Sequence, residues 1–219
     1  MAETAGKALV LDFGGVISRT LFETHHLSEA ALGLPPGTLT WRGPFDPSTD
    51  LLWQAMQADD ISEREYWLRR SREVGQLLGE EWHDMQTLVQ RARGADVQAI
   101  IRPEALHAIA RAKAAGHRLA VLSNELDLFY GADFRQRLPL LQQFEVIVDA
   151  SHTGILKPDP RAYAACQAQL GVGASDVVFV DDQWRNVAGA QRCGWDTVHF
   201  DVREPGLSYH LALQKLEAS

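Results

Sequence analysis

The chain has 219 residues, of which 46% are hydrophobic and 23% are charged, a balance typical of a globular protein rather than a disordered or fibrous one. Its formal net charge of −8 argues against nucleic acid or an anionic membrane as a partner, because binding to such surfaces needs concentrated positive charge. The longest apolar runs fall far short of the roughly 20 residues of a membrane-spanning helix and no signal peptide is evident, so we expect a cytoplasmic protein.

The N-terminal part of the chain predicts one strand followed by a long helical insertion. Residues 7–13 form a short apolar run that ends at Gly14-Gly15, which is typical of a buried strand. Helical patterns without any clear strand then cover residues 21–32, 51–58, 62–78 and 80–93. We therefore expect an inserted helical cap over residues 18–94 and a core formed by residues 1–17 and 95–219.

The rest of the chain alternates between the two kinds of pattern. Expected strands cover residues 118–124, 145–149, 177–182 and 196–200, and expected helices cover residues 103–115, 126–141, 160–170, 184–193 and 208–217. This alternation predicts an α/β fold with a doubly wound parallel sheet, in which ligands bind at the carboxyl ends of the strands. Cys166 and Cys193 lie in the helical segments outside any ligand pattern, and we interpret both as reduced thiols.

Polar residues stand where three of the expected strands end, so the fold would gather them at one edge of the sheet. Asp12 follows the first strand, and its carboxylate suits a nucleophile that attacks phosphorus. A simple strand-ending turn is the alternative interpretation of Asp12. Asp181 and Asp182 are adjacent carboxylates that would be costly to crowd beside Asp12 without a cation, and Mg²⁺ prefers such oxygen ligands. The alternative is that Asp182 caps the next helix.

Two further segments offer groups that bind phosphate. Ser123-Asn124 supplies a hydroxyl and backbone donors after the second strand, and Lys157 supplies a positive charge. Taken singly, each has a simpler explanation, because Ser-Asn is a common turn and a loop lysine is usually solvated.

The order and context of these segments resemble the haloacid dehalogenase-like hydrolase superfamily. The matching stretches are LVLDFGGVI at residues 9–17, LAVLSN at 119–124, TGILKPDPRAY at 153–163 and VFVDDQWRNVAGA at 178–190. The resemblance covers residues 7–17 and about 97–200, whereas the insertion matches only in position, length and helical character. It implies a nucleophile at Asp12, a phosphate held by Ser123 and Lys157, a magnesium ion bound by Asp12, Asp182 and the Gly14 carbonyl, and supporting roles for Asp181 and Asn186.

One position departs from the family's phosphatases. They usually carry a second aspartate two residues after the nucleophile as a general acid and base, and here that position is Gly14. A magnesium-dependent phosphatase for a small phosphorylated substrate, such as a sugar phosphate, remains the preferred prediction. The alternatives are a 2-haloacid dehalogenase, which needs no such acid, and a catalytically silent binding protein. Either a monomer or a homodimer is compatible with the sequence.

No clear pattern in the insertion indicates which of its residues contact the substrate. Arg19, His25 and His26 follow the first strand most closely, so we predict that they contact substrate. The basic stretch at residues 64–72 is interleaved with glutamates and predicts a solvated helix face. Tryptophans at helical spacing in the insertion predict core positions.

Overall fold

The computed structural model describes residues 6–93 and 97–218, and the chain divides into two compact units. One unit contains the described residues up to Arg19, Ile101–Asp127 and those from Ala132 onward. The other contains Thr20–Ile100, apart from the undescribed residues 94–96, and Leu128–Gly131. No described helix is both long enough and apolar enough to cross a lipid bilayer. That residues 18–94 act as a cap over a site stays a prediction.

The first unit contains a parallel sheet of five strands in the order β3-β2-β1-β4-β5. Each strand lies within its predicted range, and the predicted α/β class is confirmed. The strands are β1 (Ala8–Leu11), β2 (Arg118–Ser123), β3 (Val146–Asp149), β4 (Val177–Asp181) and β5 (Asp196–His199). All four residues of β1 are fully buried, as expected of a central strand covered on both faces.

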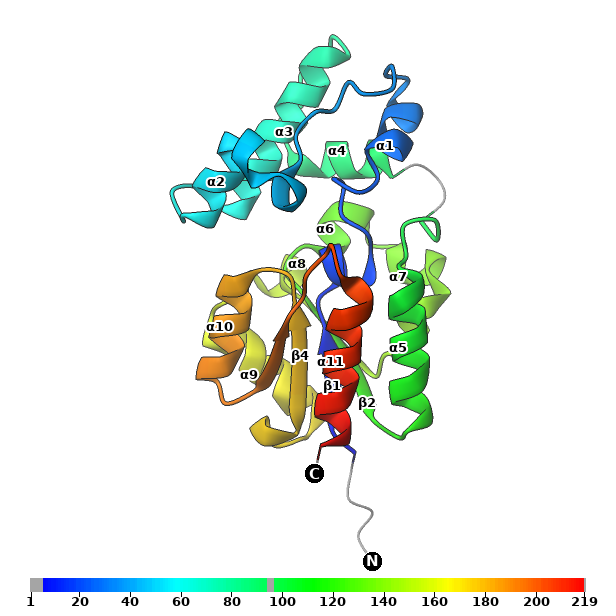
Figure 1. Ribbon diagram of the computed structural model, residues 1–219, viewed down its shortest axis with the longest axis vertical. Helices are drawn as coiled ribbons and strands as arrows, with labels where there is room; N and C mark the ends of the chain where they lie inside the picture. Colours follow the sequence, from blue (N-terminus) through cyan, green and yellow to red (C-terminus); the bar gives the residue numbers. More distant parts are fainter. Residues whose placement is uncertain (1–5, 94–96, 219) are drawn as a thin grey trace, which may run out of the picture. The chain divides into compact units, whose positions relative to one another are not determined.

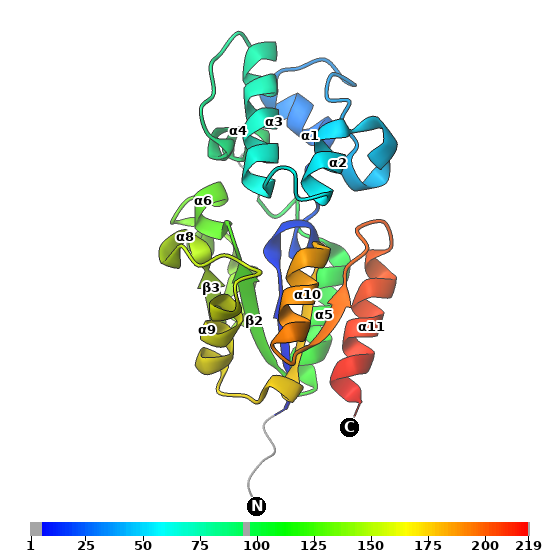
Figure 2. The same ribbon diagram turned by 90° about the vertical axis from the view of Figure 1, so that its left-hand side faces the viewer.

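Helices cover both faces of this sheet (Figures 1 and 2). α5 (Pro103–Ala114) and α11 (Pro205–Glu217) pack together on one face, while α9 (Pro160–Leu170) and α10 (Trp184–Arg192) pack together on the other. The core on the second face includes Tyr163, Phe179 and Trp195, whose rings meet edge to face at 5.4–5.9 Å between centroids.

The predicted helix over residues 126–141 is wrong as a single element. The structure divides it into α6 (Leu126–Tyr130), α7 (Phe134–Arg137) and a 3₁₀ turn at Pro139–Gln143, followed after β3 by the short α8 (Ala150–Thr153). Gly131 has a φ of 87°, which ends the first piece, and Pro139 lacks the backbone donor that a continuous helix needs. The sequence pattern was apolar enough for a helix, but these two residues break it.

The second unit is helical throughout its regular elements, as the sequence predicts. It contains α1 (His25–Leu32), α2 (Leu51–Gln57), α3 (Glu63–Leu77) and α4 (Met85–Ala92), and α3 packs against both α2 and α4. Side-chain caps begin three of these helices, because Asp50, Ser62 and Asp84 each accept a hydrogen bond from a backbone amide in the first turn.

An aromatic cluster forms the centre of this second unit. Arg70 lies inside it, with its guanidinium 5.2–5.5 Å from two ring centroids and 2.6 Å from the carboxylate of Asp50. The basic stretch is therefore not wholly a solvated face, because Arg70 reaches the core by pairing with a buried carboxylate. The cluster contains Phe22, Trp41, Trp53, Tyr66 and Trp67.

His25 belongs to this cluster and its burial makes unfolding pH-dependent. The imidazole packs edge-on against Trp41 at 4.4 Å between centroids. Burial lowers the pKa of His25 from 6.5 to about 4, Glu29 opposes this shift, and Arg42 and Arg70 add to it. The unfolded state therefore binds a proton between pH 6.5 and 4 that the folded state does not, so stability is fully present above pH 6.5 and falls as the pH drops through this window.

We expect the free energy of unfolding to fall by about 1–2 kcal/mol between pH 7.5 and pH 4.5 because of His25. The full shift in the pKa of His25 corresponds to roughly 3 kcal/mol of stability, and the partial exposure of the imidazole to solvent reduces this contribution. Denaturant titrations at the two pH values measure the difference, and His25→Gln should remove that share of it. His26→Gln is the matched control, since His26 is exposed. An equal pH dependence in wild type and His25→Gln would contradict the assignment.

Candidate active site

The site lies where the strand order reverses in the sheet. β1 is flanked by β2 on one side and β4 on the other, and the carboxyl ends of β1 and β4 form the crevice in which doubly wound folds bind ligands. Asp12 directly follows β1, and its backbone amide donates to the Val180 carbonyl at 2.9 Å. Asp181 ends β4. The two aspartates are thus brought together by strand pairing, although 169 positions of sequence numbering separate them.

Lys157 joins these two carboxylates. Its Nζ lies 2.7 Å from Asp12 Oδ1 and 2.6 Å from Asp181 Oδ2, and only 1% of the lysine side chain is exposed. Burial alone would lower the pKa of Lys157, but the negative charges of Asp12 and Asp181 outweigh it and raise the pKa above its usual range. Lys157 is therefore a fixed positive charge beside Asp12, not the solvated loop lysine of the alternative interpretation.

Asp181 is fully buried and saturated by neighbouring donors. Oδ1 accepts hydrogen bonds from the Gln183 backbone amide at 2.8 Å and from the Asn186 side-chain amide at 3.1 Å, while Oδ2 accepts from Lys157 and Asn186. Such a carboxylate is well placed to hold Lys157 and poorly placed to contact substrate. The supporting roles of Asp181 and Asn186 stay predictions, and these hydrogen bonds are consistent with them.

Asp12, Asp181 and Asp182 offer carboxylate oxygens that lie within 4.8 Å of one another. Asp182 does not cap α10, because Gln183 occupies the N-cap position and makes no side-chain capping bond. Asp12 and Asp182 are half-buried, whereas Asp181 is closed in. The donor set consists of oxygen atoms at the rim of a sheet, which fits a hard divalent cation such as Mg²⁺.

Ser123 ends β2, the strand next to β1, and Asn124 follows it, but their side chains are placed differently. Ser123 is 6% exposed at the end of the strand. Asn124 Oδ1 accepts a hydrogen bond from the Lys157 backbone amide at 2.7 Å, and its Nδ2 donates to the Lys157 carbonyl at 3.2 Å. The Asn124 side chain therefore holds the loop that contains Lys157 in place. The candidate contact of Asn124 with phosphate is then its backbone amide rather than its side chain.

Residues 13–16 form a type II turn immediately after the nucleophile candidate. Gly14 has φ −69° and ψ 126°, and Gly15 has φ 76° and ψ −24°. The positive φ explains why Gly15 is glycine, since other residues adopt it at a cost. Gly14 needs no such freedom, and a Cβ built on it would meet only Asp12 Oδ2, at 3.9 Å. The backbone conformation at position 14 therefore does not require glycine.

The three candidate substrate contacts Arg19, His25 and His26 belong to different units. Arg19 is the last residue of the first segment of the sheet unit and is half-buried. His25 and His26 belong to the helical unit, where His25 packs in the aromatic cluster and is uncharged at neutral pH. Contact of these three residues with substrate stays a prediction.

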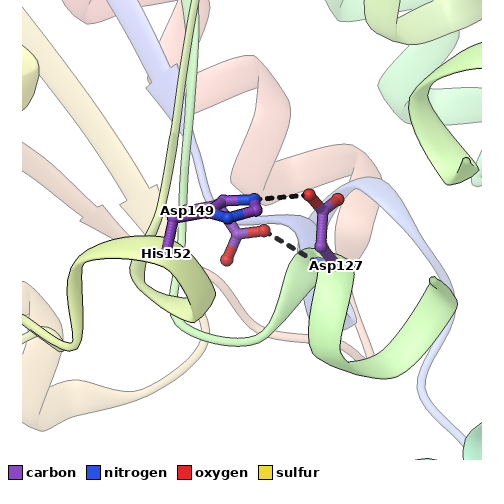
Figure 3. Close-up of side chains that lie close together, drawn as sticks. All are labelled: Asp127, Asp149 and His152. Carbon is purple, nitrogen blue, oxygen red and sulfur yellow. Dashed lines mark hydrogen bonds and ion pairs between the residues drawn. The ribbon is translucent and has the colours of Figure 1, made fainter. Parts of the chain in front are cut away.

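A second cluster of ionisable groups lies at the carboxyl end of β3, where Asp149 pairs with Ser123 of β2 (Figure 3). His152 Nε2 lies 2.6 Å from Asp127 Oδ2, and Asp149 Oδ2 accepts a hydrogen bond from the Asp127 backbone amide at 2.8 Å. The three side chains have the composition of a metal site, and their ligand atoms lie within 4.8 Å of one another.

The contacts of this second cluster give it a structural role. Asp149 already accepts backbone hydrogen bonds at both oxygens, from Leu126, Asp127 and Ser151. Arg135 adds positive charge, at 3.6 Å from Asp127 and 3.8 Å from Asp149. Because a guanidinium already faces both carboxylates, we interpret the cluster as a brace that fixes α6 and α8 beside β3.

Comparison with known proteins identifies the family. The chain matches the haloacid dehalogenase-like hydrolase family over residues 7–194, and it belongs to that family. The architecture agrees, since a dehalogenase crystal structure superposes with a TM-score of 0.60 at 21% identity, covering 91% of this chain and 86% of the other. The resemblance seen in the sequence is confirmed.

Curated relatives include enzymes of two kinds. The chain is 30% identical over 129 residues to (S)-2-haloacid dehalogenase 4A of Burkholderia cepacia, and this match covers 59% of this chain and 55% of that protein. The chain is also 34% identical over 92 residues to Phosphatase MT3486 of Mycobacterium tuberculosis, and this match covers 42% of this chain and 42% of that protein. A 117-residue match of 36% identity to Acyl-CoA dehydrogenase family member 10 of Mus musculus covers 53% of this chain and 10% of that protein. These matches span at most about half of the relatives' lengths.

Proposed function

We propose that this hydrolase is a magnesium-dependent phosphatase that acts on a small phosphate ester, such as a sugar phosphate, through a phosphorylated Asp12. The observation that carries the proposal is the half-buried Asp12, which contacts Lys157 and lies beside the adjacent pair Asp181-Asp182. Asp181 would hold Lys157 in either reaction, but the half-buried Asp182 has a use as a metal ligand in a metal-dependent phosphatase and none in a metal-free dehalogenase. The phosphatase among the relatives supports the same reaction class.

The reaction divides into two displacements at phosphorus. A carboxylate oxygen of Asp12 attacks the phosphorus atom, the bond to the leaving oxygen breaks, and an acyl phosphate forms. Water then attacks the same phosphorus, the bond to Asp12 breaks, and phosphate is released with Asp12 restored. The leaving oxygen takes up a proton in the first displacement and the attacking water loses one in the second, so the protons balance over the cycle.

The chain's own residues orient this chemistry. Lys157 holds Oδ1 of Asp12 by a hydrogen bond, and the charge of the lysine offsets that of the phosphoryl group. Ser123 and the backbone after it would hold a phosphoryl oxygen. Asp12, Asp182 and the Gly14 carbonyl would hold magnesium, which supplies further positive charge next to the phosphoryl oxygens.

A 2-haloacid dehalogenase is the second candidate, since Gly14 leaves no general acid and halide departs without a proton. Two kinds of measurement separate the candidates. Phosphate release from a panel of phosphate esters with Mg²⁺ is expected, and halide release from 2-chloropropionate is not. Halide release without phosphate release would replace the phosphatase proposal. Neither product from a broad panel would favour a silent binding protein.

Removing one expected metal ligand should weaken magnesium binding without unfolding the protein. Asp182→Asn relieves repulsion among three crowded carboxylates, so we expect the fold to persist while the Mg²⁺ concentration for half-maximal activity rises roughly tenfold or more. Excess EDTA should abolish turnover of the wild type. Asp201→Asn, a half-buried aspartate paired with Arg203, is the control. Full phosphatase activity in EDTA would contradict the metal assignment.

The remaining proposals concern the whole protein. Residues 18–94 would act as a cap that selects the substrate, with Arg19, His25 and His26 as its first candidate contacts. We further propose a cytoplasmic monomer or homodimer whose partner is a small phosphorylated molecule rather than nucleic acid or a membrane.

A further inference from the structure

Gly189 lies in the interior of α10, a position where alanine would ordinarily give a more stable helix. The structure explains the glycine by the space around it. A Cβ at this position would lie 2.6 Å from the hydroxyl oxygen of Tyr163 and 2.8 Å from Cβ of Pro158, and Cβ atoms essentially never approach other atoms more closely than 3.0 Å. Gly189 therefore permits a contact between α10 and a neighbouring segment that alanine would prevent.

The neighbouring segment, residues 157–163, is the one that carries Lys157, and we call it the lysine segment. Pro158 directly follows the lysine, and Tyr163 lies near the start of α9. Neither contacted atom can yield easily, because Cβ of Pro158 belongs to a ring closed onto the backbone and Tyr163 is fully buried. The Tyr163 hydroxyl also donates to the Asn186 carbonyl at 2.8 Å, which ties it to α10. An added methyl group would therefore have to separate α10 from the lysine segment.

The start of α10 controls the other side of the lysine contact through Asp181. The Asn186 side chain donates to both oxygens of Asp181 at 3.1 Å, and the Gln183 backbone amide donates to Oδ1 at 2.8 Å. Lys157 Nζ meets Oδ2 of the same carboxylate at 2.6 Å. Separation would move either the lysine segment, and with it Lys157, or α10, and with it the donors that orient Asp181. Either movement disturbs the contact between Lys157 and Asp181.

We propose that Gly189 is a positioning residue, whose missing side chain lets α10 and the lysine segment approach closely enough for Lys157 to contact Asp181 and Asp12 together. The lysine has little room to compensate by changing its conformation, because only 1% of its side chain is exposed. This inference rests on the proposed function, in which the lysine holds Asp12 and offsets the charge of the phosphoryl group.

Gly189→Ala tests the proposal in the whole protein by crystallography and by kinetics. We expect at least one of the two distances from Lys157 Nζ to its carboxylates to lengthen beyond about 3.5 Å, the limit of a hydrogen bond. A misplaced charge beside the nucleophile should lower kcat for phosphate esters by roughly 10- to 100-fold, since displacements of about 1 Å have effects of this size. Tyr163→Phe removes the oxygen that the new methyl group meets, so Gly189→Ala should lower kcat less in Tyr163→Phe than in the wild type.

Two controls separate positioning from a general effect on the helices. Gly206→Ala fills open space at the start of α11 and should keep the wild-type kcat. Cys166→Ala leaves a small cavity beside α9, where Cys166 is fully buried, and should lower Tm while keeping the wild-type kcat.

Retention of both Nζ contacts in the Gly189→Ala crystal, or the wild-type kcat in that variant, would overturn the positioning role. If Gly189→Ala does not fold, an equal kcat in Tyr163→Phe with and without Gly189→Ala would overturn it, because the added methyl group still meets Pro158. Absence of phosphate release by the wild type would overturn the proposed function instead, and the crystal distances would still decide the role of Gly189.

Discussion

Replacing Asp12 by asparagine should reduce turnover by roughly 10⁴-fold or more, because an amide cannot attack phosphorus to form the acyl intermediate. The variant should remain folded, since Lys157 keeps its 2.6 Å contact with Asp181 and a neutral group replaces one of three crowded carboxylates. Steady-state phosphate release, with circular dichroism as the check on folding, measures both expectations.

A matched variant and a bound mimic sharpen this test. Asp196→Asn removes an exposed aspartate at the start of β5, the opposite end of the sheet from the site, and should leave turnover unchanged. Beryllofluoride mimics an acyl phosphate and should attach to Asp12 in a crystal of the wild type. Its attachment to Ser123 instead would reverse the roles assigned to these two residues. Residual turnover above about 10% in Asp12→Asn would contradict nucleophilic catalysis by Asp12.

Much of the sheet and of the rim of the site could be predicted from the sequence because both follow from local pattern. The apolar runs that become β1, β2 and β4 are short and bounded by polar residues, so they indicate strands buried on both faces. Parallel pairing then necessarily places Asp12, Ser123 and Asp181 at the same edge. The contact of Lys157 with both aspartates needed the structure, since the lysine comes from a loop and not from a strand end.

What the sequence did not reveal depends on pairs of residues far apart in the chain. Arg102 meets Gly15 across 87 positions, and Tyr209 meets Val16 across 193. Neither residue lies in a pattern that sets it apart from an ordinary helix start or an ordinary core aromatic. Arg70 was assigned to a solvated face for the same reason, because its buried partner Asp50 lies 20 positions earlier.

Gly14→Asp tests how the natural protein works without the family's second aspartate. Gly14 has φ −69° and ψ 126°, which any residue adopts, and a new Cβ would lie 3.9 Å from Asp12 Oδ2. The added carboxyl group would therefore stand beside the nucleophile. Nearby carboxylates raise the pKa of such a group, which favours the protonated form that a general acid needs.

We expect Gly14→Asp to raise kcat/KM for simple alkyl phosphates by about 10²-fold and for aryl phosphates much less. An alkoxide leaves phosphorus with difficulty unless it receives a proton, whereas an aryl oxide leaves without one, and general acid catalysis is worth roughly 10² to 10⁴-fold. The natural protein should accordingly prefer aryl, acyl or anomeric sugar phosphates. Slow attack of water on phospho-Asp12 would also produce a burst of leaving group before slower turnover.

The deciding measurement is the dependence of kcat/KM on the pKa of the leaving group in both proteins. The natural protein should show a steep negative slope, and Gly14→Asp should flatten it. Gly14→Asn is the control, because it fills the same space without an acid and should keep the steep slope. A flat dependence in the natural protein would show that another group already supplies the proton. His26 would then be a better candidate than His25, since His25 is half-buried among aromatic rings and loses its proton above about pH 4.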